Sequence, residues 1–150
     1  MAVIIVSACL LGCECRYKGD HCRCEELLAL QKEHTLIGAC PEQLGGLPTP
    51  RVPSERQGNR VTSREGTDVT AQYRKGAAEI LRLAKISGAS VAVLKAKSPA
   101  CGKGRIYDGS FTGGMTDGNG VAAELLLENG IAVFSEEELP ALREYLAGMK

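Results

Sequence analysis

The alternation of short apolar runs with helical segments is the feature that most constrains the fold of this chain. The run AVIIVS at residues 2–7 is rich in β-branched residues, as expected of a strand buried on both faces. Similar apolar runs occur at residues 35–39, 91–95 and 131–134. Helical patterns or helix-start signals lie between and after them, at residues 25–32, 68–87, 121–128 and 135–147. This order predicts an α/β fold, a Rossmann-like three-layer sandwich with a mostly parallel four-stranded sheet, in a single domain over residues 1–150.

A cysteine comes within a few residues of the end of each of the first three apolar runs: Cys9, Cys40 and Cys101. If the strands are parallel, their carboxyl ends meet at one edge of the sheet, which is where open α/β sheets bind ligands. Three thiols delivered there suit a metal ion or an iron–sulfur cluster, although neither common ferredoxin spacing occurs in the chain. One free cysteine alone would more often be a small buried apolar residue, so the prediction depends on all three acting together.

Two long stretches between these elements are rich in turn-forming residues. Residues 43–66 contain several prolines and glycines, so we expect an irregular excursion rather than a packed element. Residues 98–120 are rich in glycine, which suits a backbone that closely approaches a ligand. Gly102, Lys103 and Gly104 could help to cradle a phosphate there, without matching the P-loop or dinucleotide fingerprints. A flexible flap is the alternative interpretation of this segment.

Composition and charge exclude several classes of partner. Eighteen basic and eighteen acidic side chains cancel, so no overall field would attract a membrane or a large nucleic acid. The absence of Trp and the presence of only two Phe argue against base-stacking platforms. The N-terminus lacks the basic region of a signal peptide, and its apolar run is too short to span a bilayer. We therefore expect a cytoplasmic protein, in which seven cysteines indicate metal binding or catalysis before disulfides.

Five sequence blocks together form a longer pattern. They are SACLLG at 7–12, CRY at 15–17, CPEQLGGLPTPR at 40–51, REG at 64–66 and SPACGKGRIYDGSFTG at 98–113. This pattern resembles the 2-thiouracil desulfidase family, formerly a domain of unknown function. The resemblance extends from about Val3 to Phe134, and the blocks are too long for a chance match.

The resemblance implies a [4Fe-4S] cluster held by Cys9, Cys40 and Cys101, with one iron open to take sulfur from a thiocarbonyl. It implies a non-redox exchange of C=S for C=O that releases hydrogen sulfide from a small-molecule substrate, either 2-thiouracil or a thiouridine monophosphate. The catalytic pair falls on Glu42, which would accept a proton from the attacking water, and on Ser98, which would relay one. Substrate contacts are expected from residues in the matched blocks: Ser7, Arg16, Gly102, Lys103 and Gly104.

The chain departs from the family pattern in two places. Lys18-Gly19-Asp20 comes after the CRY block, where Asp-Gly is usual. Cys13, Cys22 and Cys24 are additional, and Cys15 belongs to a family block and could replace Cys9 as a ligand. Two C-x-C pairs around His21 could form a second zinc site, a redox switch or a set of incidental thiols.

Two other functions stay open at this point. One is a cysteine-ligated zinc hydrolase in which Glu42 activates a zinc-bound water. The other is a non-enzymatic carrier of metal or sulfur, in which Glu42 and Ser98 would have no chemical role.

Overall fold

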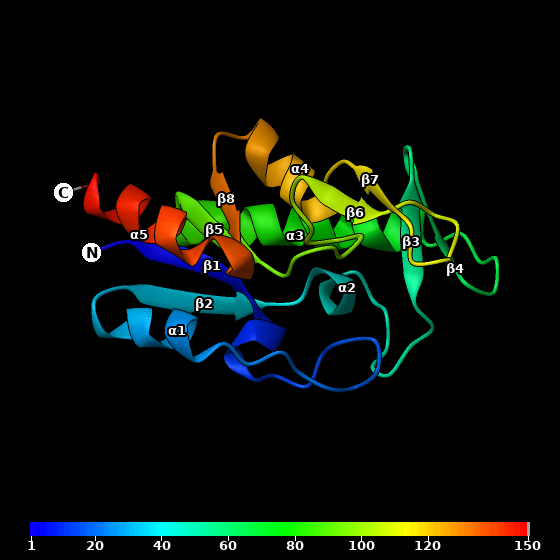
Figure 1. Ribbon diagram of the computed structural model, residues 1–150, viewed down its shortest axis with the longest axis horizontal. Coiled ribbons are helices and arrows are strands. Elements are labelled where there is room, and N and C mark those ends of the chain that lie inside the picture. Colours follow the sequence, from blue (N-terminus) through cyan, green and yellow to red (C-terminus); the bar gives the residue numbers. More distant parts are fainter. Residues whose placement is uncertain (150) are drawn as a thin grey trace.

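The structure, a computed structural model that describes residues 1–149, has a parallel four-stranded sheet at its centre (Figure 1). The strands are β1 (Val3–Ser7), β2 (Thr35–Ala39), β5 (Val91–Leu94) and β8 (Ala132–Ser135), in the order β2-β1-β5-β8. Every neighbouring pair in this sheet is parallel. The predicted α/β fold is therefore confirmed.

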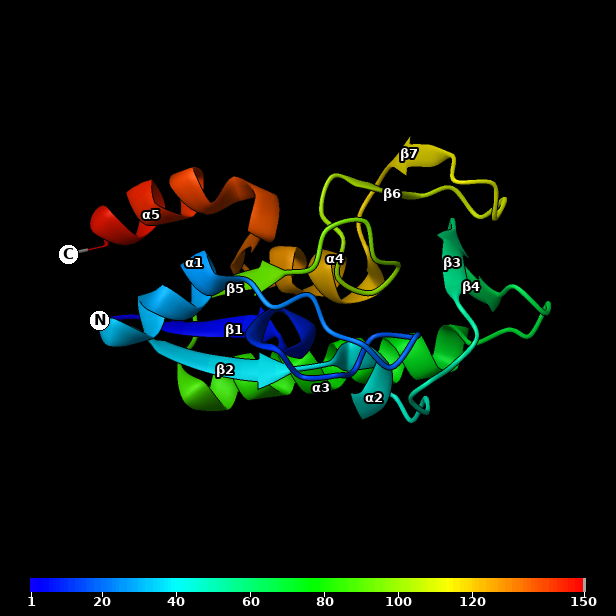
Figure 2. The same ribbon diagram turned by 60° about the horizontal axis from the view of Figure 1, so that its bottom comes forward.

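Helices cover both faces of the sheet, which explains why β1 and β5 are continuous apolar runs. On one face, Ile5 and Ala92 pack with Ile80 of α3 (Thr70–Ser87) and Leu126 of α4 (Val121–Glu128). On the other face, alternate strand residues such as Ile4 and Val93 pack against α1 (Glu25–Leu28) and α5 (Leu139–Ala147). Figure 2 shows α3 and α5 on opposite sides of the sheet. The period of two along β1 thus divides its side chains between two apolar layers.

The helices begin and end at residues with a clear local reason. Ser135 and Glu138 form a capping box at the predicted helix start, and it opens a short 3₁₀ turn, Glu136–Glu138, ahead of α5. Helix α3 ends at Gly88, whose left-handed backbone (φ 73°) glycine adopts without strain. The predicted helix at 25–32 is α1 with a 3₁₀ turn, Ala29–Lys32, directly after it.

Each of the two turn-rich stretches contains a β-hairpin, so the prediction of a wholly irregular excursion at 43–66 was wrong. Strands β3 (Ser54–Gln57) and β4 (Arg60–Ser63) pair antiparallel within it, and β6 (Arg105–Tyr107) and β7 (Met115–Asp117) pair within the glycine-rich stretch. The two hairpins are tied together, because the Glu55 carboxylate accepts hydrogen bonds from the backbone N–H groups of Gly109 and Phe111, at 3.0 and 3.1 Å. These strands are short and mostly polar, and they are held by contacts distant in sequence.

The chain leaves the centre of the sheet in two directions. After β1 it crosses to β2 on one side, and later to β5 on the other side of β1. The segments after β1 and β5 therefore diverge, which opens a crevice at the carboxyl ends of these strands. The first of them is a 3₁₀ turn, Ala8–Leu11, and the segment after β2 is the one-turn helix α2 (Pro41–Leu44).

Helix α2 lies directly on α3, backbone against backbone. A Cβ atom added to Gly76 of α3 would lie 1.8 Å from the carbonyl oxygen of Pro41, and one added to Gly45 would lie 2.0 Å from that of Gln72. Only glycine leaves room for this approach. The contact fixes the segment Cys40-Pro41-Glu42 against the longest helix of the fold. No helix within residues 1–149 is long and apolar enough to cross a membrane.

Candidate functional site

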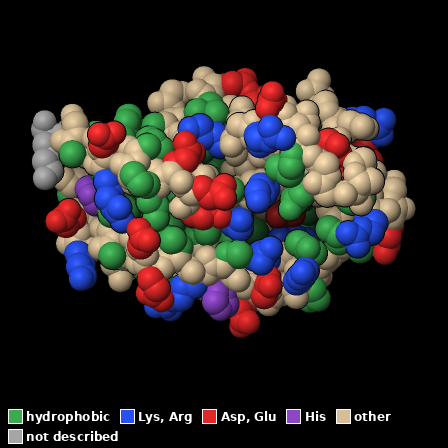
Figure 3. Space-filling view, in the orientation of Figure 1, with side chains coloured by type: hydrophobic (Ala, Val, Ile, Leu, Met, Phe, Trp, Pro, Cys, Tyr) green, Lys and Arg blue, Asp and Glu red, His purple; other side chains and the backbone are tan. Residues whose placement is uncertain are grey.

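A cavity of about 440 Å³ opens at the carboxyl ends of β1, β2 and β5. Seen from outside, this face of the protein is hollowed beside a group of Lys and Arg side chains (Figure 3). The walls come from the segments after the three strands and from both hairpins. The cavity has the size and position of a small-molecule site in an open α/β sheet.

The three cysteines predicted from the strand ends all line this cavity. Cys9 lies on the 3₁₀ turn after β1, Cys40 is the residue before α2, and Cys101 lies in the turn after β5. Cys9 and Cys101 are buried and Cys40 is partly buried. The parallel sheet thus brings together thiols that are far apart in the sequence. Their role as ligands stays a prediction.

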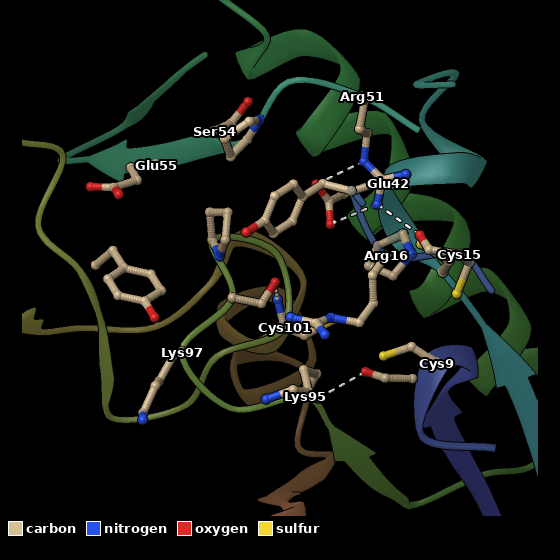
Figure 4. A pocket seen from close by; sticks show the side chains of 18 of the residues that line it. Cys9, Cys15, Arg16, Glu42, Arg51, Ser54, Glu55, Lys95, Lys97 and Cys101 are labelled. Atoms are coloured by element: carbon tan, nitrogen blue, oxygen red, sulfur yellow. Dashed lines mark hydrogen bonds and ion pairs between the residues drawn. The ribbon is translucent and has the colours of Figure 1, made fainter. Parts of the chain in front are cut away.

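Cys15 contributes a fourth thiol to the same cavity (Figure 4). It is buried, and the neighbouring thiols of Cys9 and Cys40 affect its pKa. Cys40 Sγ also lies 3.8 Å from the Cys15 carbonyl oxygen, to which it donates. Cys15 therefore remains an alternative to Cys9 as a ligand on grounds of position.

The thiols at this end of the sheet are poorly acidic. Burial raises the pKa of Cys101 to about 12, against the effect of hydrogen bonds from Ser7 and Ser98. The pKa of Cys40 is raised by its hydrogen bond with Cys15 and by burial. For Cys15, the hydrogen bond with Cys40 acts to lower the pKa, but Cys9 and burial outweigh it and raise the pKa to about 11. Such thiols lose their protons most readily when a cation binds the sulfur, because the cation compensates the buried negative charge.

Glu42 projects from the first turn of α2 into the cavity, where it is held by two buried side chains. Arg51 forms an ion pair with it, with Nη2 3.3 Å from Oε2 and Nε 3.4 Å from Oε1. The hydroxyl of Tyr73 donates a hydrogen bond to Oε1. The side chain of Glu42 keeps 18% of its surface exposed, so the carboxylate is held firmly and still reaches the solvent of the cavity.

Ser98 also lines the cavity, at the start of the turn that carries Cys101. Its Oγ accepts hydrogen bonds from the backbone N–H groups of Ala100 at 3.1 Å and Cys101 at 3.0 Å. Two donors on the oxygen leave its own proton free to be donated, and they stabilise negative charge on the oxygen. This local arrangement is suited to proton relay.

The predicted substrate contacts divide into two groups. Ser7 and Arg16 line the cavity, and the labelled Arg16 points into it in Figure 4. Gly102, Lys103 and Gly104 are not among the lining residues: the Gly104 N–H donates to Asn119 at 2.8 Å, and Lys103 pairs with Glu138 at 3.3 Å. The turn folds back on itself here, because the Gly102 N–H donates to the Ser98 carbonyl at 2.8 Å.

Several residues that sequence reasoning missed complete the walls. Within residues 1–149, Lys97 (φ 70°) and Phe111 (φ 58°) are the two non-glycine residues with a left-handed backbone, and both line the cavity. Arg64 lies over the Phe111 ring, 5.9 Å from its centroid. Strained backbone of this kind persists where the surrounding structure or a function requires it. Arg51, Arg64 and Phe111 lie inside the matched sequence blocks, so these blocks could have marked them as candidate site residues.

The additional cysteines show no second metal site. Within the described part of the chain, no group of three or more His, Cys, Asp and Glu side chains is placed to hold a single metal ion. Cys22 and Cys24 instead pack against the apolar layer next to α1, while Cys13 is exposed. His21 Nδ1 accepts a hydrogen bond from the backbone of Arg23 at 3.1 Å. These observations give no support to the predicted alternative of a zinc site.

The fold and the site together define an α/β protein with a thiol-lined small-molecule cavity. The family model described as 2-thiouracil desulfurase matches residues 4–138, and the chain belongs to this family. The resemblance found in the sequence blocks is thereby confirmed. The chain is also 44% identical to the uncharacterized protein YbbK of Bacillus subtilis (strain 168), over 91% of this chain and 97% of that protein.

A solved structure matches nearly the whole fold. It is described as the [4Fe-4S]-dependent thiouracil desulfidase TudS, and it superposes with a TM-score of 0.94 at 47% identity. The match covers 98% of this chain and 99% of that one. The arrangement of sheet, helices and hairpins described above is therefore shared with that enzyme.

Proposed function

We propose that this protein is a [4Fe-4S]-dependent desulfidase, which replaces the thiocarbonyl sulfur of a thiolated pyrimidine by oxygen and releases sulfide. The observation that carries the proposal is the convergence, in one cavity, of thiols from three strand ends with the held carboxylate of Glu42 and the hydroxyl of Ser98. Family membership and the close match to a thiouracil desulfidase support the same activity.

The donor set of the cavity fits an iron–sulfur cluster. Thiolates are the ligands that such clusters use, and a cluster accepts thiolates that are spaced too widely for one metal ion. Cys9, Cys40 and Cys101 would hold it, with Cys15 as the alternative to Cys9. When bound through three thiolates, the cluster would supply an iron free of protein ligands, a Lewis acid for a soft thiocarbonyl sulfur. All seven cysteines are free, which supports a reducing compartment, and we infer the cytoplasm.

The two polar side chains would move the protons of the reaction. Water adds to the carbon of the C=S group, and Glu42 accepts the proton that this water loses. Ser98 donates a proton to the ring nitrogen or to the departing sulfur. The carbon ends with a C=O bond, the sulfur leaves as hydrogen sulfide, and no electrons enter or leave. The reaction is therefore a hydrolysis that needs no reductant.

The far wall of the cavity supports a nucleotide as well as a free base. Arg64 and Lys97 line it, and among residues 1–149 neither forms an ion pair. Lys97 lies across the cavity from Cys9 and Cys15 in Figure 4, where a phosphate attached to a bound base would extend. Tyr107 and Phe111 also line the cavity, and Arg64 lies over the Phe111 ring. We infer that a thiouridine monophosphate binds more tightly than 2-thiouracil.

Sulfide release by the anaerobically reconstituted protein tests the proposal. With 2-thiouracil or 4-thiouridine monophosphate as substrate, we expect one sulfide and one oxygenated pyrimidine per turnover without added reductant. Glu42→Gln and Ser98→Ala should retain iron and the visible absorption of the cluster but lose turnover by about 100-fold or more. Full turnover in both variants would refute the roles of Glu42 and Ser98. A fully loaded wild-type protein that releases no sulfide would favour a non-enzymatic carrier, and a colourless protein with stoichiometric zinc would favour a zinc hydrolase.

A further inference from the structure

The Glu42 carboxylate is held by an unequal set of partners. Oε1 accepts from both Tyr73 Oη and Arg51 Nε, whereas within residues 1–149 Oε2 has the single partner Arg51 Nη2. A carboxylate can accept about four hydrogen bonds, so Oε2 keeps accepting capacity. The carboxylate is thereby oriented, with one oxygen occupied and the other available to the cavity that Glu42 lines.

We propose that Arg51 and Tyr73 are positioning residues, which fix the plane of the Glu42 carboxylate so that Oε2 takes the proton of the attacking water. This inference rests on the proposed function. Neither residue needs to touch the substrate: Tyr73 is 1% exposed, and the side chain of Arg51 is 5% exposed. Nothing in the reaction described above assigns them a role.

Arg51 connects three segments of the site. Its guanidinium donates to the carbonyl oxygens of Cys15 at 2.9 Å and Pro48 at 3.1 Å, in addition to its ion pair with Glu42. Its backbone N–H donates to the Tyr17 carbonyl at 2.8 Å. A planar guanidinium with several donors is suited to this task, whereas the point charge of lysine cannot form the same set of bonds. Arg51 thus fixes the position of Glu42 relative to the segment that carries Cys15.

Tyr73 reaches Glu42 from a different element of the fold, helix α3. It lies on α3, which α2 touches through Gly45 and Gly76, so the donor and the acceptor come from two rigidly packed helices. Burial, and then the charge of Glu42, raise the pKa of Tyr73 well above its ordinary value. The phenol therefore keeps its proton and acts as a permanent hydrogen-bond donor to Oε1.

The test compares Tyr73→Phe, Arg51→Ala and Arg51→Lys with the wild type after reconstitution to equal iron content. For Tyr73→Phe we expect kcat to fall about tenfold or more with KM nearly unchanged, because a hydrogen bond to a charged group is lost. Tyr145→Phe, at an exposed tyrosine, is the matched control and should not change kcat. The visible absorption should be that of the wild type in all variants.

Chemical rescue separates positioning from general structural support. Arg51 lines the cavity, so Arg51→Ala leaves a space that solutes can reach. Guanidinium ions should restore a substantial part of its kcat, whereas methylammonium ions, which lack the planar fork, and the Arg51→Lys substitution should not. Guanidinium should have no such effect on Arg82→Ala, where the exposed arginine pairs, among residues 1–149, only with Glu79.

Several outcomes would overturn the inference. They are an unchanged kcat in Tyr73→Phe, full activity in Arg51→Lys, failure of guanidinium to restore Arg51→Ala, or a loss of iron that parallels the loss of activity. If Arg51→Ala does not fold, Tyr73→Phe decides alone. Absence of sulfide release by fully loaded wild-type protein would instead refute the proposed function itself, so the two failures are distinguishable.

Discussion

Replacing Gly76 by alanine tests whether the contact between α2 and α3 positions the site. Helix propensity alone favours the change, because alanine is better than glycine in a helix interior by about 1 kcal/mol. The structure instead predicts that the substitution destabilises the protein. The new Cβ would lie 1.8 Å from the Pro41 carbonyl oxygen, and both partners are backbone atoms or fixed to the backbone. Helix α2 must therefore move away by more than an ångström.

Overpacking of this kind costs roughly 3 kcal/mol, which leaves a net destabilisation of about 2 kcal/mol after the gain in propensity. For a chain of this length the melting temperature should fall by about 4–8 °C. The displaced helix carries Glu42 and begins next to Cys40. Because misplacement by an ångström can reduce a rate by about 100-fold, we expect a loss of turnover of that order.

The assay pairs a thermal or urea unfolding curve with sulfide release at equal iron content. Ala78→Gly, at an exposed position of the same helix, is the control and should lose about 1 kcal/mol of stability with turnover unchanged. A Gly76→Ala protein that is more stable than the wild type, or fully active, would show that the close approach of the two helices has no such role.

Three further predictions concern other parts of the chain. Lys97→Gly should raise the free energy of unfolding by about 1 kcal/mol, because glycine adopts φ 70° without strain. It should also weaken binding of the nucleotide substrate. Unchanged stability would contradict the strain, and unchanged binding would contradict a role of Lys97 in the site. Hydrogen bonds from the side chain and the backbone of Thr70, and then from Arg60, lower the pKa of Asp68 to about 2. The contribution of Asp68 to folding stability is therefore complete above its ordinary pKa and disappears as the pH falls through about 2. Asp68→Asn should therefore lower the urea midpoint near neutral pH but not at or below pH 2, and an equal difference at both would contradict this. Cys22→Ala and Cys24→Ala should retain iron, and its loss from either would give these thiols a role in binding the cluster.

The sheet and the thiols on it could be predicted because both depend on local pattern. Continuous apolar runs such as AVIIVS indicate strands buried on both faces, and parallel strands deliver the residues after their carboxyl ends to one edge of the sheet. The position of Cys9 and Cys40 in the cavity can be derived from that rule alone. The start of the final helical segment could also be predicted, because the capping box of Ser135 and Glu138 is a sequence signature.

The hairpins and the charged walls of the cavity could not be predicted in this way. Strands β3 and β6 are short and mostly polar, and they are held by contacts such as that of Glu55 with Phe111, which no period in the sequence reveals. Arg51 and Lys97 lie in loops, where the neighbours of a single charged residue depend on the tertiary fold. For the same reason the glycines near Lys103 were expected to bind substrate, although the turn there folds back and carries them away from the cavity.

The iron content of four single-cysteine variants decides which thiols hold the cluster. Cys9→Ala, Cys15→Ala, Cys40→Ala and Cys101→Ala would each be reconstituted anaerobically, and iron and visible absorption measured per chain. We predict about four irons in the wild type and in Cys15→Ala, and loss of the cluster from the other three. Full iron in Cys9→Ala with loss from Cys15→Ala would transfer the ligand role to Cys15. Full iron in Cys9→Ala, Cys40→Ala and Cys101→Ala would contradict the convergence of these thiols on one centre.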